Sequence, residues 1–405
     1  MKSKRMRVFV TGAAALAIGV YAEIGYSGEN NLSKGDTVDA AVRKGLKWLV
    51  SVQGKDGGWG QDGGETSYVR QGERLESKGN DVANTAVVAE ALLHAGSSPT
   101  LGEYREPLQR AVNFILQHVE QSPAEGLAVT DLNGTQIQRK LGPYIDTFLT
   151  SKLLAELDGT MSDAQANARV RRSLQKCVAK IEKSQLKDGS WNIAGGWAPI
   201  LGTSMASQSL YMAQQKGAAQ PMMALKSVDN YTKVTAAEPV TGVVGGVASR
   251  VTVGGNASVA SVAPAASAGV PLYKRAQELE QLSRSEEDRK ANAPKITAIK
   301  EQLADARVIS GFGSIGGEEF FSYLNIGDSL HRTGGPEWEK WNGDMKAKIL
   351  KMQNEDGTWA GHHCITGRVA VTSAAVLMLL ADREPVVQPT SLKKPGPAKP
   401  GPIKQ

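Results

Sequence analysis

The sequence predicts an all-α fold in which about five pairs of outer and inner helices form an α/α barrel. Three observations support this prediction. A four-residue motif occurs three times, an amphipathic segment precedes each copy, and a more apolar segment rich in small residues and Thr follows each copy. Helices that are apolar on one face lie at a surface, whereas helices that are apolar nearly all round are buried. Their alternation along the chain therefore predicts two concentric rings.

The repeated motif contains Gln, Asp, Gly and Trp, with Gln six residues before Trp. Its copies supply Gln53, Asp56 and Trp59, then Gln185, Asp188 and Trp191, and finally Gln353, Asp356 and Trp359. Asp-Gly favours a turn, and Gly tolerates the positive φ that ends a helix. The Gln amide can bond the open carbonyls at a helix end, and the indole adds a large apolar body with one N–H donor. Each copy is therefore expected to fasten a helix C-terminus to the following loop.

The expected outer helices are amphipathic, with apolar residues at helical spacing. They cover residues 38–53, 107–119, 163–183 and 336–352. The expected inner helices cover residues 81–94, 144–157, 203–214, 318–330 and 366–380. The charged segment 271–303 is helix-prone and is expected to supply the outer partner of residues 318–330.

Two segments depart from this pattern within or after the expected α/α domain, which spans residues 39–383. Residues 217–269 are rich in Ala, Val, Gly, Ser and Pro and poor in charge, which is typical of a flexible insertion or linker. Alternatively, the Val-rich pieces around residues 243–247 pair as short β-strands. The tail 384–405, rich in Pro, Gly and Lys, is expected to be disordered.

The N-terminus has the pattern of an export signal. A basic stretch ends at Arg7, an apolar stretch follows, and residues 20–22 fit the small-x-small cleavage pattern. We therefore expect residues 1–22 to be a signal peptide, residues 23–38 to be a linker, and the mature protein to be periplasmic or extracellular. The alternative is an uncleaved N-terminal anchor. No other segment is long and apolar enough to cross a bilayer.

The formal net charge of +6 arises in large part at the two ends of the chain. Tail charge of this kind reflects export and solvation, and the body carries no basic patch interleaved with aromatic residues. Nucleic acid is therefore not an expected partner. Cys177 and Cys364 are the only cysteines, so no disulfide framework is expected, although one bridge between them is chemically feasible in an oxidising compartment.

The three repeated motifs resemble the QW repeats of squalene-hopene cyclases, oxidosqualene cyclases and the β-subunits of protein prenyltransferases. The resemblance covers most of residues 39–383 and implies the α/α-toroid fold of that superfamily. The chain looks most like exported bacterial proteins with prenyltransferase and squalene oxidase repeats. The resemblance implies no single function, because the fold also serves thioester-bearing domains that are not enzymes.

Squalene cyclases of bacteria protonate an alkene with the central acid of an Asp-x-Asp-Asp-Thr-Ala motif, and this demands a strong, preorganised acid. Residues 81–86 here keep Asp81, but Ala83 and Asn84 replace the two central acids. A second partial match holds the single acid Asp146. Only 5% of the residues are aromatic, although cyclases line their cavities with aromatic side chains that stabilise carbocations. Both features argue against carbocation cyclisation.

Protein prenyltransferases hold zinc through an Asp, a Cys at the start of an inner helix and a later His. The resemblance therefore makes His362, His363 and Cys364, which precede the last expected inner helix, candidate zinc ligands. A remote carboxylate would complete the site, and the candidates are Asp146, Glu318 and Glu319. The alternative is that both histidines cap and pack the helix start while the thiol is buried.

The glycine-rich segment 311–319 precedes another expected inner helix, and backbone N–H groups at a helix start can hold an anion. It resembles the thioester segment of complement-type toroids, but Phe312 occupies the cysteine position, so no thioester can form. The alternative is a plain helix start at which Glu318 and Glu319 favour the positive end of the helix dipole.

Two functions are consistent with these residues. In the first, the protein is a binding module or degenerate enzyme that holds an apolar isoprenoid or lipid-like ligand in a central cavity, or a protein partner at one end. In the second, it is an active enzyme of the terpenoid cyclase or prenyltransferase type. The acids or metal ligands of that enzyme would be Asp81, Asp146, Glu318, Glu319, His362, His363 and Cys364.

The topology of a toroid also predicts where these residues meet. All inner helices start at one end, so residues 362–364 are expected to lie close to residues 311–319. The helix dipoles at that end lower the pKa of a thiol, so Cys364 is expected to react more readily than Cys177.

Overall fold

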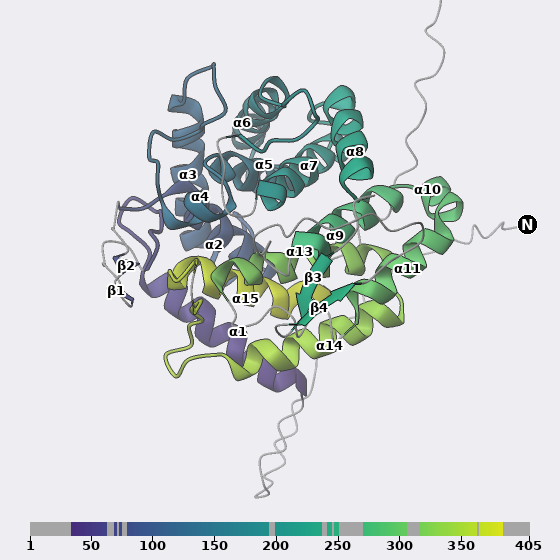
Figure 1. The fold of residues 1–405 in the computed structure, drawn as a ribbon. Coiled ribbons are helices and arrows are strands. Elements are labelled where there is room, and N and C mark those ends of the chain that lie inside the picture. The colour runs from purple at the N-terminus through teal and green to yellow at the C-terminus, as the bar shows by residue number, and fades with distance from the viewer. Residues whose placement is uncertain are drawn as a thin grey trace, which may run out of the picture.

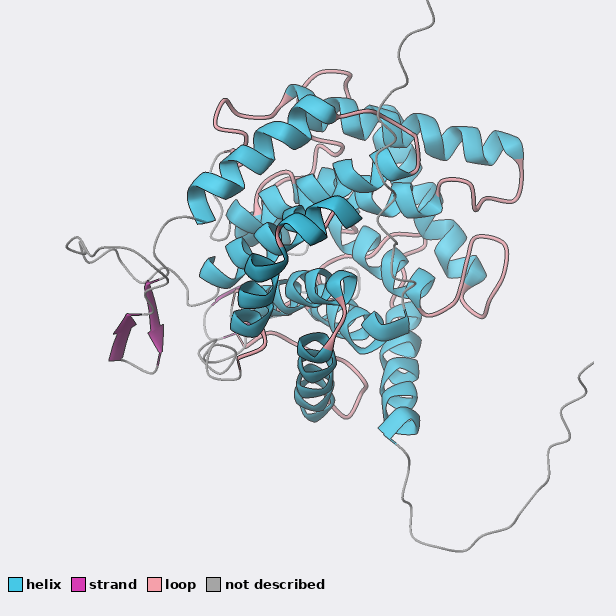
Figure 2. Cartoon of the chain, turned by 90° about the vertical axis from the view of Figure 1, so that its right-hand side faces the viewer, coloured by secondary structure: helices cyan, strands magenta, loops and turns pink. Residues whose placement is uncertain are grey.

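The computed structural model of the chain describes residues 34–62, 69–70, 73–74, 79–193, 199–236, 241–244, 247–250, 270–305, 316–362 and 364–383. These residues are nearly all helical (Figure 2). The expected signal peptide, the expected C-terminal tail and His363 lie outside the described residues.

Six of the described helices form an inner ring. They are α2 (Val82–His94), α5 (Ile145–Leu157), α7 (Pro199–Gln215), α9 (Val270–Leu282), α13 (Gly317–Thr333) and α15 (Arg368–Leu380). Each packs on the next in chain order, and α15 packs on α2 to close the ring (Figure 1). In α2 and α15 almost every residue is buried, which explains why these segments are apolar nearly all round.

Six further helices surround this ring. They are α1 (Lys34–Ser51), α3 (Arg105–Gln121), α6 (Ala164–Lys183), α8 (Met222–Ala236), α11 (Ala293–Leu303) and α14 (Pro336–Lys351). Each lies against one or two inner helices with its apolar face. The remaining helical pieces are α4 (Gln136–Leu141), α10 (Glu286–Ala291) and the 3-10 helix η1 (Ala381–Arg383). The all-α toroid expected from the repeats is confirmed.

The described ring contains six outer–inner pairs, where the sequence pattern indicated about five. The additional pair is α8 with α9. The predicted insertion 217–269 therefore begins too early, because α8 lies inside it and buries Ala224, Leu225 and Val228. Segment 271–303 does supply an outer helix, α11, but its first part is the inner helix α9. The charge of this segment predicts an outer helix throughout, yet Glu278 and Glu280 of α9 are buried.

The described strands form two small antiparallel pairs. Strand β1 (Val69–Arg70) pairs with β2 (Glu73–Arg74), and β3 (Thr241–Val244) pairs with β4 (Val247–Arg250). The second pair confirms the alternative interpretation of the Val-rich pieces as short strands. In the register of this pair, Thr241 faces Arg250 and Val244 faces Val247.

In all three repeats the indole of Trp bonds a carbonyl at the end of the preceding outer helix. The indole N–H groups of Trp59, Trp191 and Trp359 donate to the carbonyls of Leu49, Ile181 and Ile349 at 2.7, 2.8 and 2.8 Å. These carbonyls belong to the last helical turn, and each also accepts the backbone N–H three residues further on, from Val52, Ser184 and Met352. The expectation that the Gln amide would satisfy them is therefore wrong, because the indole reaches them instead.

The Gln amide bonds the next outer helix. The amides of Gln53, Gln185 and Gln353 donate to the carbonyls of Pro107 in α3, Ala224 in α8 and Ala41 in α1, each at 2.9 Å. Each amide also donates to the carbonyl of the motif glycine. The motif thus ties one outer helix to its neighbour, and the third copy closes the ring between the two ends of the domain.

A threonine of an inner helix completes each motif. The backbone N–H groups of Trp59, Trp191 and Trp359 donate to the hydroxyls of Thr85, Thr203 and Thr372 at 2.9, 3.1 and 3.0 Å. Thr is frequent in the expected inner helices, but its distance from the motif varies along the chain, so the sequence did not reveal this pairing. No helix in the described ranges combines the length and the apolar character that crossing a membrane requires.

Candidate functional site

The N-terminal ends of inner helices meet at one end of the toroid, which we call the rim. Gly317, at the start of α13, packs so closely that a Cβ there would lie 1.8 Å from the carbonyl oxygen of Ile365. A Cβ on Gly361 would lie 2.0 Å from the same oxygen. The start of α13 and the loop before α15 are therefore in backbone contact. The expected proximity of the two loops is confirmed for these residues, whereas residues 311–315 lie outside the described part.

A glutamine pair joins α4, the loop after Trp59 and the start of α15 at this rim. The side-chain carbonyl of Gln136, in α4, accepts the backbone N–H groups of Thr366 and Gly367 at 2.8 and 3.1 Å. The backbone N–H of Gln136 in turn donates to Oε1 of Gln61, in the loop before α2, at 2.7 Å. Both glutamines are buried. Their hydrogen bonds hold the start of α15 against α4 and against the loop that contains Gln61.

Asp81 and Asp146 lie close together in this rim, at the starts of the neighbouring helices α2 and α5. Asp81 caps α2, because its Oδ1 accepts the backbone N–H of Asn84 and its Oδ2 accepts the Asn84 amide, both at 2.8 Å. Asp146 accepts the backbone N–H of Ala83 at 3.1 Å and the side-chain amide of Gln138 at 2.6 Å. The sequence identified both aspartates as candidates, and the structure adds that they form a pair.

The environment of this pair favours the protonated carboxyl. Burial, together with the negative charge of Asp146, raises the pKa of Asp81 to about 7. Burial raises the pKa of Asp146 to about 6, although the hydrogen bond from Gln138 opposes the change. Groups with such pKa values can donate or accept a proton near neutral pH. All four carboxyl oxygens are engaged by the protein, however, and each side chain is 2% exposed, so a substrate reaches neither without a rearrangement.

Glu318 and Glu319 form a second acid pair in the first turn of α13. Both are buried. Burial, followed by the charge of Glu318, raises the pKa of Glu319 to about 8, and the ammonium of Lys348 only partly opposes this. A helix N-terminus favours negative charge, so desolvation outweighs the dipole at this position. Lys348 itself donates to the hydroxyl of Tyr323 at 3.1 Å.

The loop before α15 carries the residues expected as zinc ligands. His362 is exposed and Cys364 is half-buried. Cys364 has a φ of 61°, a left-handed conformation that costs a non-glycine residue about 1–2 kcal/mol. The three-residue metal-ligand group found among the described residues includes neither of them, and His363 lies outside the described part. The zinc role of these three residues stays a prediction.

No disulfide joins Cys177 to Cys364. Cys177 is fully buried in α6, and burial raises the pKa of its thiol to about 12. Its expected role as a packing residue of an outer helix is confirmed.

A cluster of ionisable side chains lies further along the inner helices, towards their C-terminal ends. We call it the axial cluster; it consists of Glu90, His94, Lys152, Glu156 and Asp328. Nε2 of His94 lies 3.0 Å from a carboxylate oxygen of Glu156, Lys152 forms an ion pair with Glu90, and the Lys152 ammonium lies 3.9 Å from the Asp328 carboxylate. Helices α5 and α13, which carry Lys152 and Asp328, are not ring neighbours, so these side chains meet across the interior.

No sequence motif points to this cluster. The signal that could have revealed it is a pair of four-residue spacings, Glu90 to His94 and Lys152 to Glu156, on two helices that are otherwise apolar. A second polar contact crosses the ring where Asn325 of α13 donates to Ser204 of α7 at 3.0 Å. The interior is therefore polar and ionic at these positions, in contrast to the apolar central cavity expected for an isoprenoid.

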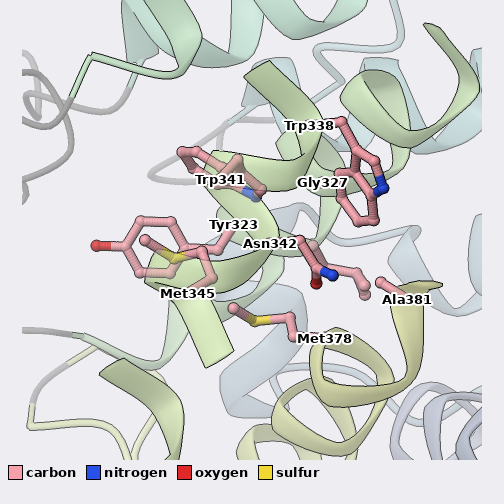
Figure 3. Close-up of a pocket in the computed structure, with 9 residues that line it drawn as sticks. Tyr323, Gly327, Trp338, Trp341, Asn342, Met345, Met378 and Ala381 are labelled. Carbon is pink, nitrogen blue, oxygen red and sulfur yellow. The ribbon is translucent and has the colours of Figure 1, made fainter. Parts of the chain in front are cut away.

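A hollow with a mainly apolar lining lies between α13, α14 and the end of α15 (Figure 3). Its lining consists of Tyr323, Leu324, Gly327, Trp338, Trp341, Asn342, Met345, Met378 and Ala381. In Figure 3 the rings of Trp338 and Trp341 stand on either side of Gly327. Glycine at this position leaves room between the two indoles, and the amide of Asn342 adds a polar group.

Comparison with known proteins bears on the fold. No family model matches the chain, and no curated protein matches its sequence. One match is an inactive α-1,6-mannanase variant from Salegentibacter sp. HEL1_6, in which two aspartates are replaced by asparagine and α-1,6-mannotriose is bound. The match has a TM-score of 0.51 and a sequence identity of 9%, and it covers 85% of this chain and 98% of the mannanase chain. Another match is a variant of a type II terpene cyclase from Scytonema in complex with its substrate, geranylgeranyl dihydroxybenzoate. This match has a TM-score of 0.50 and a sequence identity of 11%, and it covers 86% of this chain and 98% of the cyclase chain. Both are α/α-toroids, and the likeness concerns the fold.

Proposed function

We propose that this protein is an exported α/α-toroid that binds a lipid-like ligand of the isoprenoid class and does not cyclise it. The observation that carries this proposal is the hydrogen bonding of Asp81, the acid kept from the cyclase motif. Both of its oxygens accept from Asn84, the residue that replaces one of the two central acids. Protonation of an alkene requires an acid aimed at the substrate. An acid held in this way serves as the cap of α2.

The hollow of Figure 3 is the place we propose for the apolar part of the ligand; its cavity volume is about 10 Å³, so its lining side chains must move apart to admit such a chain. Ligand sites are lined mainly by apolar and aromatic side chains with a few polar groups, and this hollow has that composition. The axial cluster argues against the ring interior, because an apolar chain there would desolvate charged groups. Met345 and Met378 can adapt to the shape of a ligand, because thioether side chains are unbranched and flexible. The Scytonema cyclase shares the fold and binds a geranylgeranyl compound.

Substitution of Gly327 tests this placement. A Cβ there would lie 3.5 Å from Nε1 of Trp341 and 3.9 Å from the ring of Trp338, which is ordinary contact. Gly327→Ala therefore preserves the hollow, whereas the longer side chain of Gly327→Leu fills it. We expect organic extracts of the purified protein, analysed by mass spectrometry, to contain a lipid-like compound that Gly327→Ala retains and Gly327→Leu loses. Lipid-free extracts, or equal amounts in both variants, would count against the proposal. A co-purifying protein that Gly327→Leu loses would assign this face to a protein partner instead.

Export is the second part of the proposal, and the basic, apolar and small-residue pattern of residues 1–22 supports it. N-terminal sequencing of the protein from the periplasm or medium should begin near Glu23. An intact N-terminus in the membrane fraction would indicate the uncleaved anchor.

An acid–base enzyme is the second candidate, and the raised pKa values of Asp81 and Asp146 favour it. Neighbouring carboxyls with different raised pKa values are a common arrangement for a general acid and a general base. The α-1,6-mannanase variant that shares the fold is inactive and carries two aspartates replaced by asparagine. The test is incubation with squalene, prenyl diphosphates or α-1,6-mannosides. A product that Asp81→Asn abolishes would support the enzyme, and a product that His362→Ala abolishes would support a metal role. The enzyme candidate would be rejected if none of these substrates gave a product.

A further inference from the structure

We propose that Glu90, His94 and Glu156 bind a divalent transition-metal ion of the Zn²⁺ class inside the toroid. The ligand atoms of these three side chains all lie within 4.8 Å of one another. One imidazole nitrogen and two carboxylate oxygens are donors that Zn²⁺ accepts. The proposal does not depend on the lipid-like ligand, and it concerns residues other than the His362–Cys364 cluster.

The helices hold the three donors in nearly the right places. Glu90 and His94 are four residues apart on α2, so they project from the same face of that helix. Glu156 comes from α5, which packs on α2, and its Oε2 is already 3.0 Å from Nε2 of His94. Three donors on one tetrahedral Zn²⁺, each at about 2.0–2.2 Å, lie about 3.4 Å from one another. The His94–Glu156 separation must therefore widen slightly, and the other separations, which are at most 4.8 Å, must shorten. Sites on rigid helices hold such geometry well.

The electrostatics of the cluster also favour a cation. The side chains of Glu90, His94 and Glu156 are only 3%, 12% and 15% exposed. Carboxylates enclosed to this degree are costly unless a positive charge accompanies them. In the structure the ammonium of Lys152 pairs with Glu90 and also faces Asp328 at 3.9 Å. A metal ion on Glu90 would take over that role, and Lys152 could then pair with Asp328 alone.

Three protein ligands leave further coordination positions of the metal for water or a polar group of a ligand. The ion would also join α2 to α5 at the end opposite the rim. Because it binds the folded chain and not the unfolded one, it should raise the melting temperature with increasing metal concentration.

The experiment uses the purified full chain, stripped with a chelator and titrated with Co²⁺ as a spectroscopic probe and with Zn²⁺ in competition. We expect one ion per chain, a ligand-field spectrum without a thiolate-to-metal charge-transfer band, and a raised melting temperature. His94→Ala and Glu156→Gln each remove a ligand of the metal. Loss of a residue that only supports a ligand weakens metal affinity about 10–100-fold, so each of these substitutions should weaken it at least as much. The control is the triple variant His362→Ala, His363→Ala and Cys364→Ala, which should bind as the wild type does.

Lys152→Met gives an independent test that does not remove a ligand. It takes away the cation that competes for Glu90, so it should strengthen metal binding while lowering the melting temperature of the metal-free protein. A purely structural ion pair predicts the lower melting temperature without the gain in affinity. The proposal is overturned if the folded wild type binds no metal, if Glu156→Gln and Lys152→Met leave the affinity unchanged, or if binding shows thiolate charge transfer and is lost in the triple variant.

Discussion

Gly57, Gly189 and Gly357 show how a single residue type is selected at each repeat. Their φ values are 91°, 91° and 89°, a region that other L-residues rarely adopt. Each glycine also lies against the backbone of the next outer helix, so that a Cβ on Gly189 would lie 2.3 Å from the carbonyl oxygen of Ser227. Glycine is therefore required both for the turn and for the contact between outer helices.

Replacement of Gly357 by alanine tests this requirement. A Cβ there would lie 2.8 Å from the Cβ of Lys44 and 2.9 Å from its backbone. With the unfavourable φ added, we expect Gly357→Ala to lower the free energy of unfolding by more than about 1 kcal/mol. Gly343 is the matched control, because it is exposed within α14 and a Cβ there meets nothing within 4 Å. Gly343→Ala should be neutral or stabilising by about 0.5–1 kcal/mol in chemical denaturation.

The carboxyls of the rim make stability depend on pH. The pKa of Asp81 is about 7 in the folded chain against an ordinary value of 3.8, so the folded state binds the proton more tightly than the unfolded state. Stability should therefore fall as the pH rises between these two values. Asp81→Asn keeps a cap oxygen but does not titrate, so it should flatten this dependence. Denaturation curves across this range check the result, and an unchanged slope in the variant would show that Asp81 ionises normally.

The two thiols should differ in reactivity. Cys177 is fully buried, and its thiol has a pKa of about 12, so it carries almost no thiolate at neutral pH. Cys364 is half-buried at the rim. Labelling of the folded protein with a thiol reagent, followed by peptide mass spectrometry, should modify Cys364 and leave Cys177 intact. Labelling of Cys177 alone would contradict the described packing of α6.

At the scale of helices, each repeat is a joint between three elements. The indole binds the end of one outer helix, the Gln amide binds the next outer helix, and the Trp backbone binds a Thr of an inner helix. The four motif residues could be recognised in the sequence because their spacing is fixed. The partners of the Trp backbone and of the Gln amide could not, because the ring brings them together from positions 12 to 312 residues away.

The joint formed by Gln353 is the one that closes the ring, because its amide reaches Ala41 of α1. Gln353→Ala removes this bond and the bond to Gly357, leaving two carbonyls without that donor. We expect the free energy of unfolding to fall by about 1–2 kcal/mol. Gln117, which is exposed on α3, provides the control, and Gln117→Ala should change the free energy by less than about 0.5 kcal/mol. Equal effects of the two substitutions would show that the closing bond contributes nothing.

The composition of the segments that form α8 and α9 predicts the wrong structure for both helices, and the reason is physical. Helix α8 lies in an Ala- and Val-rich stretch that is typical of a linker, and α9 carries charges that are typical of a surface helix. Yet Glu278 and Glu280 of α9 are buried beside Arg275 and Arg284. Ion pairs of this kind allow a charged helix to occupy an inner position, and sequence periodicity does not report them.

At the scale of the whole molecule, the ring determines which candidate residues can act together. The sequence placed Asp81 and Asp146 at inner-helix starts, and the toroid makes them neighbours. The four-residue spacings on α2 and α5 do not show that Glu90, Lys152 and Asp328 meet, because this contact forms only when the ring brings three helices together. The same ring leaves Asp81 and Asp146 engaged by hydrogen bonds within the protein, and it leaves the apolar hollow between α13, α14 and α15. The proposed binding function rests on this arrangement.

The fate of an isotope-labelled geranylgeranyl compound, incubated with the purified full-length protein, tests this central claim most directly. We predict that wild type and Gly327→Ala bind the compound and release it unchanged on extraction, and that Gly327→Leu fails to bind it. A cyclised or transferred product that forms with the wild type and disappears with Asp81→Asn would contradict the claim and establish an acid-catalysed enzyme.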